Sequence, residues 1–397
     1  MAAREEERFV EDPFTDEEVL ADAADYVRRL LANRRTLARR HERREARRLR
    51  RHRRMWKPAL RMFTLTRLAM ADLVREHGRE LAQDGPLDEV STALLLLWGH
   101  AARCVEGVEH SLAGGYVDDA QARARTVFEH AVMAHIIGEY GREPGSDLAE
   151  RFLAHRLARL AKDIELQQEY PDPELSELPA DQVEAVREQV RGFKDRWGEK
   201  FGQTYGWAHG LPGMGKTIKF EHLQQLVRTD HIRIHYRHAS HLIHSDALTL
   251  FLSEVESPEG PLMAPAGTSF GLIQPATWSL WSLGWCTESR VLHSPLRADD
   301  GGMRSNKASW LVGTQTLLEA TAAAFEATED LAEQRADRDF ERYLLPGWRG
   351  RAWARYLTWR DGGPPIRRHH PADEEPTASE PPPVSTETVT AVDTGGR

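Results

Sequence analysis

Apolar residues recur at intervals of three and four over most of this chain, and these runs end at proline and glycine clusters. Residues 147–170 show the spacing clearly, and Asp84-Gly85-Pro86 and Pro144-Gly145 interrupt it elsewhere. Such a period matches one face of an α-helix, whereas the alternation typical of β-strands is nearly absent. The sequence therefore predicts an all-α fold in which several helices form a bundle.

The breakers separate the expected helices. They cover residues 17–56, 60–80, 87–112, 120–140, 147–170, 181–197, 220–229, 230–254, 307–345 and 348–359. The first is expected to end before Pro58, because proline has no amide hydrogen to donate inside a helix. A glycine-bearing loop is expected over residues 198–215.

Charge and composition divide the chain into three expected parts. These are an acidic and then Arg-rich N-terminal helical arm (1–57), a helical bundle core (58–360) and a disordered, Pro-rich C-terminal tail (361–397). The first 25 residues carry ten acidic side chains, and residues 28–54 carry fourteen arginines. The tail has seven prolines between Gly363 and Pro383, and its composition offers too little apolar surface to offset the entropy of ordering.

Cysteine usage and the N-terminus limit the class of protein. Cys104 and Cys286 are the only cysteines and form no CxxC motif, which argues against a zinc ribbon and a disulfide framework. The acidic N-terminus lacks the apolar core of a signal peptide. We expect a cytoplasmic protein of bacterial type that does not enter a membrane.

A stretch without charged residues lies between Glu259 and Glu288. Its prolines and polar residues make it a poor membrane span. Its later half places Trp278, Trp281 and Trp285 on one helix face, which favours a buried helix with three indoles in the core. A stacking surface for a flat ligand is the alternative.

The strongest functional signal is a polar stripe on an expected helix. Tyr236, Ser240 and His244 follow one another at i, i+4 and i+8, and Arg237 lies at the edge of the stripe. A phenol, a hydroxyl, an imidazole and a guanidinium on one face can move protons and hold an anion. Polar groups on such a face predict a site.

A second polar pair precedes the stripe by more than a hundred residues. Arg125 and Glu129 lie at i and i+4, and together with the Tyr-x-x-x-Ser-x-x-x-His pattern they resemble DUF5677, a family of uncharacterised bacterial helical proteins. The resemblance covers roughly residues 90–330 and brings no established activity. Arg237, a polar residue and then His244 are also similar to the Arg-polar-x(4–6)-His signature of HEPN-type ribonucleases.

The HEPN resemblance implies an RNA-directed protein of stress or defence type, with metal-independent cleavage and no cofactor. In that hypothesis His244 exchanges a proton with a ribose 2′-OH and Arg237 stabilises the phosphate, while Tyr236 and Ser240 orient the substrate. A homodimer is also implied. The arginines from Arg28 to Arg54 would bind RNA or another polyanion without sequence preference.

Two other classes remain open. The network of Arg125, Glu129, Ser240 and His244 could be purely structural, in a non-enzymatic interaction or regulatory protein. Alternatively, a metal-dependent helical enzyme could use the histidine cluster. That cluster comprises His231, His235, His238, His241 and His244, whose spacing does not keep all five on one face.

A formal nucleotide-binding motif also occurs. Residues 210–217 read Gly-Leu-Pro-Gly-Met-Gly-Lys-Thr, which satisfies G-x-x-x-x-G-K-[ST]. A true P-loop follows a buried apolar strand, and residues 201–209 do not resemble one. We therefore expect an ordinary loop that leads into the helix at Phe220.

Overall fold

The computed structural model describes eight stretches of the chain. They are residues 17–83, 85–171, 178–229, 232–243, 254–257, 260–263, 270–294 and 301–342. The predicted tail and the helix expected at 348–359 lie outside these stretches. The division into arm, core and tail remains a prediction.

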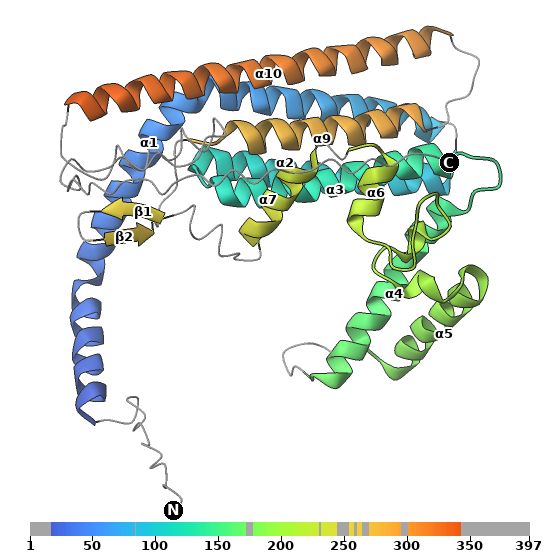
Figure 1. Ribbon diagram of the computed structural model, residues 1–397, viewed down its shortest axis with the longest axis horizontal. Helices are drawn as coiled ribbons and strands as arrows, with labels where there is room; N and C mark the ends of the chain where they lie inside the picture. The colour runs from blue at the N-terminus through green and yellow to red at the C-terminus, as the bar shows by residue number, and fades with distance from the viewer. Residues whose placement is uncertain are drawn as a thin grey trace, which may run out of the picture. The chain divides into compact units, whose positions relative to one another are not determined.

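The all-α prediction is confirmed (Figure 1). The helices are α1 (Glu17–Gln83), α2 (Glu89–Gly114), α3 (Val117–Gly141), α4 (Leu148–Glu169), α5 (Ala180–Trp197), α6 (Phe220–Leu226), α7 (Arg233–Ile243), α9 (Ile273–Leu292) and α10 (Gly301–Arg342), with short 3-10 helices η1 (Glu199–Gly202) and η2 (Gly206–Ala208). Most lie within one or two turns of the expected ranges.

A two-stranded sheet was not predicted. Strand β1 (Glu254–Ser257) pairs with β2 (Gly260–Met263). Each strand has only four residues, too few for periodicity to distinguish from a loop. The chain divides into two compact units: the helices belong to one, and most of the sheet belongs to the other.

Helix α9 is the central element of the helical unit. It packs against α1, α2, α3 and α10, and its side chains Leu280, Leu283 and Cys286 are almost completely buried. A hydrogen bond of 3.0 Å from Trp98 Nε1 to Thr287 Oγ1 ties it to α2. The low charge of this segment thus reflects burial among helices.

The ends of α2 explain why it begins and stops where it does. The Asp88 carboxylate accepts a hydrogen bond of 2.7 Å from the amide of Ser91 and caps the N-terminus. At the other end Gly115 adopts a left-handed conformation with φ of 76°, where a side chain would be strained. The guanidinium of Arg48 on α1 donates to the carbonyl of Gly114 at 2.9 Å, which fixes α1 against this terminus.

The expected break before Pro58 was wrong, because α1 continues through it for 67 residues in all. Proline leaves the carbonyl of Arg54 without its helical partner. Trp56, Ala59 and Phe63 are fully buried on either side, however, and their packing outweighs the lost hydrogen bond. Figure 1 shows that α1 changes direction where it joins the bundle, as expected for a proline-containing helix.

Replacing Pro58 with alanine should therefore stabilise the protein. Pro58 is exposed, so alanine restores a backbone hydrogen bond without opening a cavity, and we expect the free energy of unfolding to rise by about 1–3 kcal/mol. Chemical denaturation measures this, with Lys57→Ala as an exposed neighbouring control. A loss of stability would mean that the bundle needs the bend at Pro58.

Candidate functional site

The predicted polar pair lies on α3. This helix packs mainly against α2 and α9, and it also contacts α4, α6 and α7. Arg125 and Glu129 are half-buried toward α7, with side-chain exposures of 19% and 24%. Asp118 and Asp119 in the first turn favour the helix through its dipole. The bundle therefore places a cation and an anion under a second helix.

Three side chains form a closed hydrogen-bonded network. Arg125 Nη2 donates to Tyr236 Oη at 2.8 Å, and Tyr236 Oη donates to Glu129 Oε1 at 2.9 Å. An ion pair of 3.0 Å between Arg125 Nη2 and Glu129 Oε1 completes the triangle. Residues more than a hundred positions apart thus meet as the polar stripes predict, because half-buried polar groups need partners.

Aromatic rings surround this network. The Arg125 guanidinium lies 4.6 Å from the centroid of the Tyr236 ring, and Phe220 stacks on that ring at 4.9 Å. Phe128 contacts Phe220, Tyr236 and Trp278. Apolar walls lower the local dielectric constant and strengthen the charged interactions inside.

The surroundings keep the Tyr236 hydroxyl protonated. Burial, followed by the Glu129 carboxylate, raises the pKa of Tyr236 well above its ordinary value. The same two causes raise the pKa of the nearby Tyr205 to about 12. Although burial opposes it, hydrogen bonding to Tyr236 and the charge of Glu129 raise the pKa of Arg125. At neutral pH Tyr236 therefore acts as a hydrogen-bond donor, not as a base.

The other predicted site residues have different environments. Ser240 is half-buried one turn after Tyr236, and Arg237 is exposed. His244 lies outside the described residues, so its convergence with the network remains a prediction. The structure thus joins Arg125, Glu129 and Tyr236 and leaves Arg237 open to solvent.

Two donors on α3 add to the polar character of this face. Gln121 Nε2, one turn before Arg125, and Arg125 Nε are buried and make no hydrogen bond within the described part of the chain. Unsatisfied buried donors are unfavourable by about 1–3 kcal/mol each. These two groups could therefore receive acceptor atoms from a ligand or from water.

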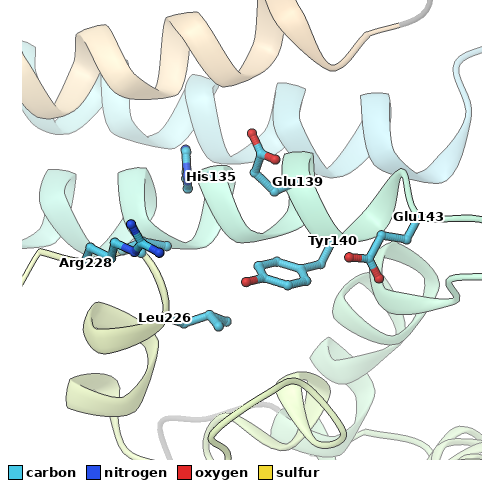
Figure 2. A pocket seen from close by; sticks show the side chains of 7 residues that line it. His135, Glu139, Tyr140, Glu143, Leu226 and Arg228 are labelled. Carbon is cyan, nitrogen blue, oxygen red and sulfur yellow. The ribbon is translucent and has the colours of Figure 1, made fainter.

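A hollow of about 340 Å³ lies further along α3, where the helix meets the end of α6 (Figure 2). Its lining combines an imidazole, two carboxylates, a phenol and a guanidinium with two aliphatic side chains. The residues are His135, Glu139, Tyr140, Glu143, Leu226, Val227 and Arg228. Sequence reasoning missed it, although His135 and Glu139 are spaced one helical turn apart.

The backbone at Arg228 explains how its side chain reaches the hollow. Arg228 has φ of 56° and follows the last turn of α6, where the amide of Thr229 donates to the Gln224 carbonyl at 3.0 Å. This termination motif usually has glycine at the left-handed position, and another residue is unfavourable there by about 1–2 kcal/mol. The left-handed conformation of Arg228 cannot be recognised from the spacing of apolar residues in the sequence.

The end of α9 also approaches the hollow. His293 Nε2 lies 3.4 Å from Glu139 Oε1, and His135 stacks on Trp285. A side chain at Gly138 would put a Cβ atom 2.5 Å from the His293 ring, so glycine permits this approach. Burial lowers the pKa of His293, which favours its neutral form.

The G-x-x-x-x-G-K-[ST] segment lacks the surroundings of a phosphate-binding loop. It follows the 3-10 helix η2, and α6 begins only at Phe220, three residues after Thr217. Lys216 is exposed, and its carbonyl accepts a hydrogen bond from the Gln203 side chain at 3.3 Å. The interpretation as an ordinary loop agrees with this geometry.

The histidines do not assemble into a metal centre in the part of the chain that is described. No group of three or more His, Cys, Asp or Glu side chains there has a suitable arrangement. His235 is exposed and hydrogen-bonded to Gln274 at 2.7 Å, whereas burial lowers the pKa of His238. His231 and His244 lie outside the described residues.

The three tryptophans of α9 are not equally buried. Trp278 is 8% exposed and Trp285 is partly buried, but Trp281 is 40% exposed. The expectation of three indoles in the core was therefore wrong for Trp281. Among the described residues, the side of α9 that carries Trp281 is therefore not fully covered by its neighbouring helices.

These features define a helical-bundle protein with a buried Arg–Glu–Tyr network between two helices. Residues 91–259 match the model of a family of unknown function, DUF5677, and this confirms the resemblance. The match contains all three network residues and ends before α9, earlier than the expected limit near residue 330. No curated protein and no solved structure matches the chain. Among the described helices, none is apolar enough over a sufficient length to cross a bilayer.

Tyr236→Phe should destabilise the protein by about 1–2 kcal/mol, because it removes a hydroxyl that both accepts and donates. Thermal or chemical denaturation measures the change. Tyr205→Phe is the matched control: Tyr205 is a half-buried neighbouring tyrosine whose hydroxyl has no partner among the described residues. Equal losses of stability in both variants would show that the Tyr236 hydrogen bonds do not contribute to the free energy of unfolding.

Proposed function

We propose that this protein binds RNA through an arginine face of α1. The observation that carries the proposal is a stripe of exposed guanidinium groups. Arg40, Arg43, Arg47, Arg50 and Arg54 share one side of the helix and are all exposed. At 1.5 Å per residue the stripe is about 21 Å long. Arginine suits phosphate because its planar donors can bind two oxygens together.

Few of these charges are neutralised by neighbouring carboxylates. Of the fourteen arginines between residues 28 and 54, only Arg48 is half-buried and the remaining thirteen are exposed. Within the described residues, only Arg28, with Asp25, and Arg48, with Glu45, form ion pairs. The free charge on this surface supports electrostatic binding to a phosphate backbone.

We further propose that the protein cleaves RNA without a metal ion. This proposal rests on the similarity to HEPN-type ribonucleases and on Arg237, which is exposed one residue after the buried Tyr236. Arg237 would stabilise charge on a phosphate, and His244 would exchange a proton with the ribose 2′-OH. Tyr236, Arg125 and Glu129 act as positioning residues that hold α7 against α3.

A second candidate is a non-enzymatic interaction or regulatory protein. The closure of the network favours it, because Arg125 and Glu129 already engage Tyr236 and each other. In that case the three side chains only fix the packing of α7. Cleavage assays separate the two candidates.

The arginine stripe predicts salt-dependent RNA binding. Arg43→Gln, Arg47→Gln and Arg50→Gln combined should weaken binding to a labelled single-stranded RNA by about ten- to a hundredfold, because three phosphate contacts are lost. Fluorescence anisotropy between 50 and 300 mM salt, about the range where counterion release dominates, measures both affinity and salt slope.

Three exposed cations on α4 provide the control for this experiment. Arg156→Gln, Arg159→Gln and Lys162→Gln remove the same charge from another surface, and binding should be nearly unchanged. Equal weakening in both variants would assign the effect to net charge and contradict a specific RNA-binding face. Deleting residues 1–56 is unsuitable here, since His52 and Trp56 are buried in the bundle.

Cleavage is tested separately from binding. The full-length protein should degrade single-stranded RNA in the presence of EDTA, and His244→Ala or Arg237→Ala should abolish degradation while RNA affinity remains. Gel analysis of end-labelled RNA should reveal products with 2′,3′-cyclic phosphate ends, as expected for attack by the 2′-OH. Binding without cleavage would favour the non-enzymatic candidate.

A further inference from the structure

The first part of α1 carries an apolar stripe that no other described residue covers. Leu20, Val27, Leu30, Leu31 and Leu37 have exposures of 52%, 49%, 40%, 54% and 44%. They recur at helical spacing on one side of α1, with Ala23, Tyr26 and the cationic Arg34 between them. The stripe resembles the seam of a coiled coil.

This part of the helix is exposed all around. Every residue from 19 to 44 is exposed, and burial begins only at Glu45 and Ala46. An isolated helix of this length is marginal in water, and an unpaired apolar stripe makes it an unfavourable surface. A partner that covers the stripe would stabilise the helix.

We propose that the partner is a second copy of this chain, packed antiparallel along residues 19–38. Charge complementarity determines both the partner and its direction. Residues 17–25 carry four acidic side chains and no basic one, whereas residues 28–44 carry eight arginines and one glutamate. Antiparallel pairing places the acidic end of each helix beside the basic part of the other. Parallel pairing would bring like charges together.

The apolar positions specify the register. The stripe is symmetric about a point between Arg28 and Arg29, so that the numbers of two facing residues add to 57. Leu20 then faces Leu37 of the other copy, and Val27 faces Leu30. Tyr26 likewise faces Leu31, so large apolar residues meet one another along about 26 Å of helix, except where Ala23 faces Arg34.

The arginine stripe and the apolar seam lie on different sides of α1. The arginine stripe of residues 40–54 lies about 140° around the helix from the apolar seam, as the 100° step per residue dictates. A dimer through the seam leaves that stripe exposed. The inference does not depend on RNA binding, and its test measures mass and cross-linking without RNA.

Sedimentation equilibrium of the full-length protein measures the association. We expect a dimer at micromolar concentration, and Val27→Glu combined with Leu31→Glu should weaken dimerisation by at least about a hundredfold, since four apolar side chains lose their contacts. Ala21→Glu combined with Ala32→Glu is the control. It adds the same charge on the opposite, exposed face and should remain dimeric. Circular dichroism should verify that both variants stay helical.

Cysteine cross-linking tests the direction. Val27→Cys should form a disulfide-linked dimer under mild oxidation, because residues 27 of the two copies lie about 4.5 Å apart along the axis. Leu20→Cys alone should not cross-link, since its two copies are about 25 Å apart, but a mixture with Leu37→Cys should. The native Cys104 and Cys286 are buried and leave the background low.

Three results would overturn the proposal. They are a monomeric wild-type protein, an unchanged dimer in the Val27→Glu and Leu31→Glu variant, and efficient cross-linking of Leu20→Cys alone. The first would mean that the stripe is covered by the chain itself or by another protein. The third would mean that the helices pair in parallel.

Discussion

The burial of α9 is the constraint on which the rest of the structure depends. This helix contributes only Glu288 and Arg290 as charged residues, and it contacts four other helices. Once α3 packs one side against α9, its polar residues must lie elsewhere on its circumference. Arg125 and Glu129 then lie under α7, where the Tyr236 hydroxyl gives both of them a partner. The position of the network thus depends on the packing of α9, although none of the three network residues belongs to that helix.

Helical periodicity was sufficient to predict most of this fold and the contacts among Arg125, Glu129 and Tyr236. The regular helices follow from local spacing and breakers, and Arg125, Glu129 and Tyr236 could be expected to meet because half-buried polar groups need partners. The sequence did not reveal the hollow near Tyr140. The hollow includes Arg228, whose backbone is left-handed, and His293 reaches the lining residue Glu139 from a distant part of the chain.

Pro58 shows that neighbouring residues alone do not determine where a helix ends. A helix break is the correct expectation for proline when only neighbouring residues are considered. In the folded chain, Trp56 and Phe63 are buried against other helices on both sides of it. Burying two aromatic side chains contributes about 3–6 kcal/mol, which exceeds the cost of about 3 kcal/mol for proline in a helix. Tertiary packing therefore decides the conformation.

The buried side of α7, which carries Tyr236, and its exposed side, which carries Arg237, differ in their capacity to contact a substrate. The hydroxyl of Tyr236 already donates to Glu129 and accepts from Arg125, and its raised pKa keeps the proton in place. The Tyr236 hydroxyl is thus suited to holding α7, whereas the buried Arg125 Nε still has no hydrogen-bond partner within the described residues. Arg237 projects from the same short helix into solvent. In the proposed function, chemistry would occur at the exposed side of α7, and the network of Arg125, Glu129 and Tyr236 holds that helix against α3.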